Sequence, residues 1–418
     1  MFQSFFIGGF ECSTHRLRSG KRLDMVAATK HDRFIRADYA RCRAHGITTV
    51  REGIRWHLIE RLPGHYDFST VLPLLRAAHE YGIQVIWDLC HYGWPDDIDI
   101  FRPEFVRRFT GLARAFTRVL TRERADPPYI APINEISFLS WKGAEVGMVY
   151  PCAEDRGFEL KAQLVRATVA ASEAIWDVAP EARLCQIEPV FNVVADLARP
   201  EDAEAAEGYR QLQFQGWDML AGRVWPQLGG SERYLDVIGV NYYPWNQWLY
   251  DGTKHAGATI DPKYPGYRPF RDILKEVYER YQRPLFIAET GCEGEKRPRW
   301  LRHIGGETCA ALASGLPLHG ICLYPIVNFP GWENERYCEN GLWDYADETG
   351  ERALYHPLAR ELKLQQLLCK HAHDRRARRV LARTDRHHCH AGFCHESAEQ
   401  SGKGSRSGAI PAPAAGKG

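Results

Sequence analysis

Short apolar runs rich in β-branched residues alternate with longer segments of helical period from the N-terminus to about residue 368. This alternation is typical of repeated βα units around a parallel sheet. The runs that we interpret as strands are 5–11, 47–52, 83–89, 129–135, 183–188, 236–243, 284–290 and 319–325. Eight such units predict a closed (β/α)8 TIM barrel, a fold that commonly forms one domain at this length.

The segments between these runs carry apolar residues on one face. The clearest stripe has spacings of three and four residues and consists of Phe105, Phe109, Leu112, Phe116 and Leu120. That periodicity predicts a helix packed on the barrel, and it recurs over 160–175 and 301–312. We interpret these stripes as core and the polar faces of the helices as solvated.

The composition changes after about Cys369. Residues 369–418 begin with a basic and His/Cys-rich stretch and end in Gly, Ser, Pro and Ala. This segment has too few apolar residues to form a core, so we expect a barrel domain at 1–368 and a disordered tail behind it. The patch 387–390 matches no standard zinc spacing, and we expect no metal there.

The bulk composition narrows the function further. The 418 residues carry a formal net charge of only +1, which gives no field for nucleic acid or an acidic membrane. The N-terminus lacks the features of a signal peptide, and no apolar run approaches the roughly 18 residues of a membrane span. The twelve cysteines are scattered and form no disulfide framework. We therefore expect a soluble, cytoplasmic protein with reduced thiols and a small neutral substrate.

Several predicted strands end in polar residues that packing alone does not require. These strand ends are Arg51-Glu52, His91-Tyr92, Asn134-Glu135, Asn241-Tyr242-Tyr243 and Glu289-Thr290. In a TIM barrel the carboxyl ends of the strands face the loops that build the active site. The pattern therefore indicates catalysis at that face.

Glu135 and Glu289 end the fourth and seventh predicted strands, so both are expected to point into one mouth. Glycoside hydrolysis needs such a pair, because one carboxylic acid protonates the leaving oxygen and one carboxylate attacks the anomeric carbon. Either residue alone could instead be a structural ion-pair partner. Glu52 and Glu188 are weaker candidates, since the retaining reaction needs two carboxyl groups only about 5 to 5.5 Å apart.

Neighbouring strand ends supply the expected supports. Arg51 would place a positive charge beside one carboxylate, and Tyr243 could donate a hydrogen bond to the same group. Asn134 could bind a sugar hydroxyl next to the reacting carbon. With the positive charge and the hydrogen bond on one carboxylate, we predict an anionic Glu289 as nucleophile and a protonated Glu135 as acid/base.

The succession Arg51, Asn134-Glu135, Asn241-Tyr242-Tyr243 and Ala288-Glu289-Thr290-Gly291 resembles the glycoside hydrolases of clan A, and most of all family 1, the β-glucosidase family. The resemblance spans about the first 350 residues. Segments 6–13, 51–56, 239–243 and 340–345 are similar to further motifs of that family. The match to its third-strand motif at 89–92 implies that His91 binds the non-reducing sugar.

The chain departs from the family at several positions. It has Pro132-Ile133-Asn134-Glu135-Ile136 for Thr-x-Asn-Glu-Pro and Glu289-Thr290-Gly291 for Glu-Asn-Gly, and both catalytic carboxylates are kept. Glu11 replaces a sugar-binding Gln, and Tyr324 replaces the eighth-strand Trp. Trp332 and Glu333 end a segment that replaces Asn-Phe-Glu-Trp. We expect changed sugar contacts at these four positions.

Aromatic residues and loops at the expected mouth bear on the substrate. Five tryptophans fall there, namely Trp94, Trp141, Trp245, Trp248 and Trp332. We expect sugar contact most of all at Trp332; the other interpretation is that these residues pack the loops onto the barrel rim. The acids and histidine at 88–97 lack a tight metal-ligand pattern, so a structural or substrate role is expected. No Gly-rich phosphate loop follows a strand, so nucleotide chemistry is not indicated.

The leading hypothesis is a retaining, exo-acting β-glycosidase that needs neither cofactor nor metal and acts on a short saccharide or an aryl or alkyl glycoside. One alternative is a barrel that binds carbohydrate without turning it over. Another is a clan A endo-glycanase. The shapes of loops 139–152 and 245–267 would decide this, because they determine whether the mouth is a closed pocket or an open cleft. The oligomeric state is left open.

Overall fold

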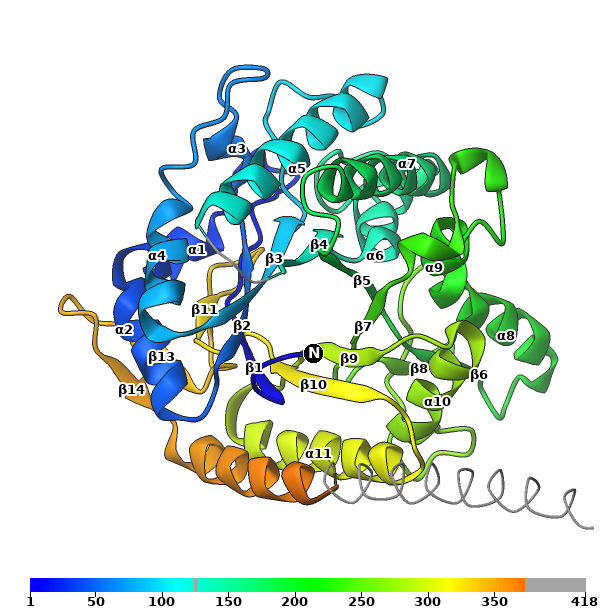
Figure 1. Ribbon diagram of the computed structural model, residues 1–418. Coiled ribbons are helices and arrows are strands. Elements are labelled where there is room, and N and C mark those ends of the chain that lie inside the picture. The colour runs from blue at the N-terminus through cyan, green and yellow to red at the C-terminus, as the bar shows by residue number, and fades with distance from the viewer. Residues whose placement is uncertain (124–126, 373–418) are drawn as a thin grey trace, which may run out of the picture. The chain divides into compact units, whose positions relative to one another are not determined.

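The computed structural model describes residues 1–123 and 127–372. Eight parallel strands close into a barrel in the order β1-β10-β9-β7-β5-β4-β3-β2, and Figure 1 shows helices around this ring. The barrel strands are β1 (Phe6–Gly9), β2 (Thr49–Gly53), β3 (Gln84–Cys90), β4 (Tyr129–Ile133), β5 (Arg183–Pro189), β7 (Val237–Asn241), β9 (Leu285–Thr290) and β10 (Leu318–Leu323). Each overlaps one predicted run, so the (β/α)8 barrel is confirmed.

The predicted helices are present as α5 (Pro103–Glu123), α7 (Gly157–Trp176) and α11 (Arg297–Ala313). The other α-helices are α1 (Met25–Ala28), α2 (His31–Ala44), α3 (Trp56–Ile59), α4 (Leu72–Tyr81), α6 (Ile136–Ser140), α8 (Ala203–Gln211), α9 (Gln215–Leu220) and α10 (Phe270–Tyr281). Single turns of other helix types are η1 (Trp141–Glu145), η2 (Pro200–Asp202), η3 (Leu212–Phe214), η4 (Pro226–Leu228), η5 (Glu232–Tyr234) and η6 (Gly294–Lys296). All five residues of the α5 stripe are buried.

The expectation of solvated polar faces is wrong for α7. Lys161 and Gln163 lie on this helix among its buried residues. The helix packs against α5 on one side and contacts α6 and α9 elsewhere, so more than its apolar stripe is covered. Periodicity in sequence cannot reveal this second layer of contacts.

Three small sheets lie outside the barrel, in segments that the sequence pattern left as loops. They pair β6 (Asn192–Ala195) with β8 (Gln247–Tyr250), β11 (Phe329–Pro330) with β12 (Tyr337–Cys338), and β13 (Trp343–Ala346) with β14 (Arg352–Leu354). The β6–β8 pair is parallel and extends the segments that follow β5 and β7. It has its own apolar cluster, in which Val193, Ala206 and Trp248 are buried.

Alternation along β2 separates two neighbouring charged residues. Arg51 points toward the barrel interior, where it contacts Asp88 of β3. Glu52 points the other way and meets α2, where its carboxylate accepts a hydrogen bond from Tyr39 at 2.9 Å and contacts the His31 ring at 2.9 Å. Because successive side chains of a strand face opposite sides, Glu52 is excluded from the barrel mouth.

The remaining expectations concern the cysteines, membranes and the tail. Ten cysteines are described, all as free thiols, and Cys12, Cys90, Cys185 and Cys322 are buried. No helix in the described ranges is long and apolar enough to cross a membrane. A last helix spans 356–372 and so includes the first four residues assigned to the tail. The predicted disorder and the His/Cys patch lie in 373–418, outside the described residues.

Candidate active site

A pocket of about 430 Å³ lies at the carboxyl ends of the barrel strands. Its lining includes most of the predicted site residues, namely Glu11, His91, Glu135, Tyr243, Glu289, Tyr324, Trp332 and Glu333. The three predicted residues that do not line it, Arg51, Asn134 and Asn241, have no exposed surface and contact the lining residues from behind. The barrel thus gathers side chains from seven of its strand ends and the segments that follow them.

Glu289 is the last residue but one of β9, and it is held by two donors. Arg51 Nη1 donates to its Oε1 at 2.8 Å, and the Tyr243 hydroxyl donates to its Oε2 at 2.8 Å. Both partners come from other strand ends, β2 and the end of β7. The cation and the hydroxyl stabilise a negative charge on the Glu289 carboxylate.

Arg51 is also the centre of a larger buried network. Its Nε and Nη2 donate to the two oxygens of Asp88 at 3.1 and 2.7 Å, and Nη2 donates to Asn134 Oδ1 at 2.7 Å. The Ala288 carbonyl accepts a fourth bond, at 3.0 Å from Nη1. Such a fork binds planar carboxylates in one orientation, so the guanidinium sets where the Glu289 side chain lies.

Glu135 follows β4 in the left-handed backbone region, with φ 48°, and begins α6. A non-glycine residue keeps this conformation only where its surroundings hold it. Here the Glu135 N–H donates to the Ile187 carbonyl of β5 at 3.0 Å, and its own carbonyl accepts from Leu139 at 2.9 Å. The turn directs the Glu135 side chain into the pocket.

Among the described residues, the hydrogen-bond partners of the Glu135 carboxyl are all uncharged. Asn241 Nδ2 donates to Oε1 at 2.9 Å, and the Tyr92 hydroxyl donates to Oε2. Burial and the charge of Glu289 raise the Glu135 pKa to about 7, although both hydrogen bonds act in the opposite direction. Glu135 can therefore hold a proton near neutral pH, whereas Glu289 is paired with a cation. Two carboxyl groups separated in this way suit an acid and a nucleophile.

Asn134 is fully occupied within the protein. Its Oδ1 accepts from Arg51, and its Nδ2 donates to the Tyr92 hydroxyl at 2.8 Å and lies 3.3 Å from His91 Nε2. It therefore joins the Arg51 network to the donor on Glu135. The expected contact between Asn134 and a sugar hydroxyl stays a prediction.

Glu188, the other acid considered at a strand end, lies outside the pocket lining. It is buried, and its carboxylate accepts from the Ser137 N–H at 3.0 Å in the first turn of α6. Burial raises its pKa to about 8. This carboxyl group supports the helix that begins at Glu135.

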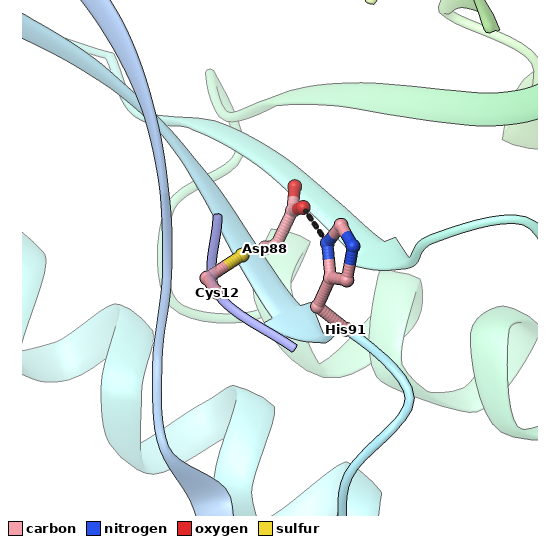
Figure 2. A group of neighbouring side chains, drawn as sticks. All are labelled: Cys12, Asp88 and His91. Atoms are coloured by element: carbon pink, nitrogen blue, oxygen red, sulfur yellow. Dashed lines mark hydrogen bonds and ion pairs between the residues drawn. The ribbon is translucent and has the colours of Figure 1, made fainter. Parts of the chain in front are cut away.

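His91 lies at the bottom of the pocket beside Asp88 and Cys12. Figure 2 shows its ring hydrogen-bonded to the Asp88 carboxylate, through Nδ1 at 2.9 Å, with the Cys12 sulfur nearby. The ligand atoms of these three residues lie within 4.8 Å of one another, which is close enough to raise the question of a metal ion.

The chemistry of this trio argues against a metal site. Both Asp88 oxygens already accept from the Arg51 guanidinium, whose positive charge would repel a cation. Burial raises the Cys12 pKa, which disfavours the thiolate that binds metals. Asp88 is better explained as the group that orients both Arg51 and the His91 ring.

Glu11 and Tyr324 complete the inner wall. Glu11 Oε1 accepts from the Ser13 N–H at 3.0 Å, and burial raises the Glu11 pKa. The Tyr324 ring lies parallel to His91 at a centroid distance of 5.8 Å, and a Cβ on Gly9 would come within 2.3 Å of it. Gly9 therefore makes room for an aromatic ring at the end of β10.

Trp332 and Glu333 form the outer wall. The Trp332 indole packs edge-on against His15 at 4.6 Å, and the Lys142 ammonium lies 5.1 Å from the indole centroid. Lys142 also forms an ion pair with Glu333 at 3.7 Å. The buried Trp332 Nε1 has no hydrogen-bond partner among the described residues. A buried donor without a partner on a pocket wall is available to a ligand.

Of the five tryptophans considered, Trp245 and Trp332 line the pocket. Trp94, Trp141 and Trp248 do not, and Trp94 packs against Phe105 and Tyr150. From the sequence we expect only an unspecified structural or substrate role for Asp88 and none for Tyr92, although these residues hold Arg51 and Glu135. Asp88 stands out as the one charged residue of its strand. Tyr92 gives no such signal beyond its place after His91.

Comparisons with known proteins bear on the fold. No protein-family model and no curated protein sequence matches the chain. Among solved structures, it resembles a β-glucosidase from Thermotoga maritima in complex with glucoimidazole, with a TM-score of 0.72 and 16% identity over 87% of this chain and 97% of that one. A family 1 β-glucosidase from the same organism gives a TM-score of 0.71 and 15% identity, over 88% of this chain and 98% of that one. The likeness establishes the barrel fold of these enzymes.

Proposed function

We propose that the protein is a retaining β-glycosidase, with Glu289 as nucleophile and Glu135 as acid/base. The observation that supports this proposal most is that two carboxyl groups lining one pocket have hydrogen-bond partners of different charge. Glu289 is paired with the Arg51 cation, whereas Glu135 has neutral partners and a pKa raised to about 7. Such a difference is what the two roles of glycoside hydrolysis require.

In the first step a Glu289 oxygen attacks the anomeric carbon as the bond to the leaving oxygen breaks, and Glu135 gives its proton to that oxygen. In the second step the ionised Glu135 takes a proton from water. The water oxygen then attacks the anomeric carbon, and the bond to Glu289 breaks. Two inversions restore the original configuration. Carboxyl groups and water suffice for this reaction, so the proposal includes no cofactor.

Glu11, His91 and Trp332 are proposed to bind the sugar that carries the reacting carbon. Both hydrogen bonds from Ser13 reach Glu11 Oε1, which leaves Oε2 of this pocket-lining residue for a ligand, and Trp332 has its unpaired indole N–H. The Thermotoga maritima β-glucosidase was solved with glucoimidazole and with deoxynojirimycin. These small ring compounds support a single sugar unit, and hence exo action, in the corresponding pocket of this chain.

Trapping of the intermediate tests the proposal. A 2-deoxy-2-fluoro β-glycoside with an activated leaving group should form a stable glycosyl ester, because the fluorine slows its hydrolysis. Peptide mass analysis should find the label on Glu289, and the Glu289→Gln variant should take none. Label on another residue would refute the assignment, and sugar binding without hydrolysis of any aryl glycoside would favour a non-catalytic barrel. NMR of the first product should show the β-anomer.

A further inference from the structure

A second pocket, of about 310 Å³, adjoins the candidate active site. Four residues line both pockets, namely Phe138, Pro189, Trp245 and Asn246. Phe138 lies three residues after Glu135, on α6, so the second pocket begins on the acid/base side of the first. A ligand held between Glu135 and Glu289 can therefore extend into it with its leaving group.

Aromatic side chains form the walls of this second pocket. Phe191 and Trp248 pack at a centroid distance of 5.0 Å on the β6–β8 pair, and Tyr209 of α8 adds an edge-on contact to Trp248. Trp141 lines the same pocket. Figure 1 shows β6, β8 and α8 grouped beside the barrel. The lining is that of a site for a flat apolar ring.

Two polar atoms of these walls bind the same backbone oxygen. Trp141 Nε1 donates to the Lys254 carbonyl at 2.7 Å, and the Tyr209 hydroxyl donates to the same oxygen at 3.3 Å. The two aromatic walls are thereby tied to one loop, and only their ring faces and edges are left for a ligand.

Lys161 of α7 is the one charged residue in the lining of this pocket. Lys161 is 9% exposed. Its Nζ donates to Gln215 Oε1 at 2.6 Å, and Gln215 is its only ion-pair or hydrogen-bond partner in the described part of the chain. An ammonium group has three donors, so two are left. Lys142, on the other side of Phe138, differs because it is paired with Glu333.

Glu188 and Glu145 are nearby acids whose charges favour the ammonium form of Lys161, against the burial that lowers its pKa. Neither acid forms an ion pair with Lys161 in the described part of the chain, where its Nζ is bonded to Gln215 alone. A buried cation is unfavourable unless an anion accompanies it. The pocket therefore offers an aromatic enclosure and an ammonium group that has no directly bonded anion among the described residues.

We propose that the second pocket receives the leaving group of the substrate and selects an aromatic ring that bears a carboxylate. The substrate class is then the β-glycosides of phenolic acids, in which the sugar is attached through the phenol oxygen. The inference rests on the proposed function, because Glu135 must deliver its proton to that phenol oxygen. The aromatic walls take the ring, and Lys161 pairs with the carboxylate at its far end.

The first experiment uses the full-length protein and compares the hydrolysis of glycosides of phenolic acids with that of glycosides of their methyl esters. The glycone that is accepted in a screen of nitrophenyl β-glycosides is attached to 4-hydroxybenzoic acid and to the longer 4-hydroxycinnamic acid, each also as the methyl ester. We expect kcat/KM to be at least about tenfold higher for one or both acids than for the matching ester, since the ester keeps the ring and loses the charge. Equal values, or a preference for the esters, would overturn the inference.

Variants assign the preference to Lys161. Lys161→Met should lower the acid-to-ester ratio of kcat/KM to about one, and Lys161→Arg should retain part of it. Lys275→Met on α10 is the control, because Lys275 is exposed and paired with Glu279. A ratio that survives in Lys161→Met would refute the role of this residue. If Lys161→Met fails to fold, Lys161→Gln replaces it in this test. The acid-to-ester comparison on the native protein does not depend on either variant.

A binding measurement separates this inference from the proposed function. Free 4-hydroxycinnamic acid should quench the tryptophan fluorescence of the full chain, with a Kd at least about tenfold larger in Lys161→Met. Binding without hydrolysis of any glycoside would sink the proposed function and leave the pocket assignment. Hydrolysis of nitrophenyl glycosides, without binding of the acid or discrimination against the ester, would sink the pocket assignment alone.

Discussion

Glu135 and Glu289 face one pocket with the same side chain, but the two sides of the barrel mouth surround them differently. Around Glu289, β2 and the end of β7 supply a guanidinium and a phenol hydroxyl. Around Glu135, β3 and β7 supply a phenol hydroxyl and an amide, both neutral. The difference shows how a barrel gives two residues of one type different electrostatic surroundings, through the charge of their neighbours.

Asp88 extends this comparison beyond the pocket wall. It binds Arg51 through both oxygens and so fixes the cation on the Glu289 side of the mouth. Asn134 then connects Arg51 to Tyr92, which is the donor on Glu135. The two carboxyl environments are therefore parts of one buried network, and changes on one side can be compared with matched changes on the other.

The largest effect is expected from Glu135→Ala. Loss of a general acid should lower kcat/KM by about 10²- to 10⁴-fold for alkyl glycosides, whose leaving groups need the proton. Dinitrophenyl glycosides should lose far less in the first step, because their leaving groups depart as anions. Steady-state kinetics across a series of leaving groups measures this difference.

Glu188→Gln is the matched control for that variant. The amide oxygen can still accept from the Ser137 N–H, so this change should keep the leaving-group dependence of the native protein. A uniform loss over the whole series in Glu135→Ala would argue against its role as acid.

A smaller effect, on stability, is expected from Arg51→Met. The substitution leaves Asp88 and Glu289 buried without their cation, and breaking a buried pair in this way lowers the free energy of unfolding by about 3–5 kcal/mol. Urea denaturation measures the change. Arg107→Met, in an exposed ion pair with Glu104, should leave the denaturation midpoint unchanged. Equal midpoints for the native protein and Arg51→Met would show that the network does not stabilise the fold.

The smallest effect concerns pH and compares two tyrosines. Glu135 must be protonated in the first step, so kcat/KM should be full below its pKa and fall as the pH rises through about 7. Tyr92→Phe removes a donor that favours the ionised Glu135 carboxylate. The basic limb of the pH profile should therefore move to higher pH by roughly one unit.

Tyr243→Phe sharpens the comparison, because its hydroxyl donates to Glu289 instead. This variant should lower kcat while the basic limb stays in place. The profiles are best measured with an alkyl glycoside, whose cleavage depends on the acid. Equal shifts in the two variants would mean that the limb does not report on Glu135.

The sequence by itself determined the barrel and the position of its two acids. Eight apolar runs, each followed by a helical stripe, define the repeating unit, since each run has to be buried between a helix and its neighbours. Glu135 and Glu289 stand at the ends of two of these runs. In a closed parallel barrel all strand ends share one face, so their common pocket followed from local pattern alone.

Only the tertiary structure decided which groups surround those acids. Arg51 and Glu289 are 238 residues apart, and their contact exists because the barrel closes. Asn134 has both amide atoms bound within the protein, which no property of its neighbours in the chain predicts. Lys161 lies on a helix face expected to be solvated, and the structure buries it in the lining of an aromatic pocket that Trp248 of β8 also lines. Periodicity reports which face of an element is apolar, whereas the partners of a polar group depend on long-range packing.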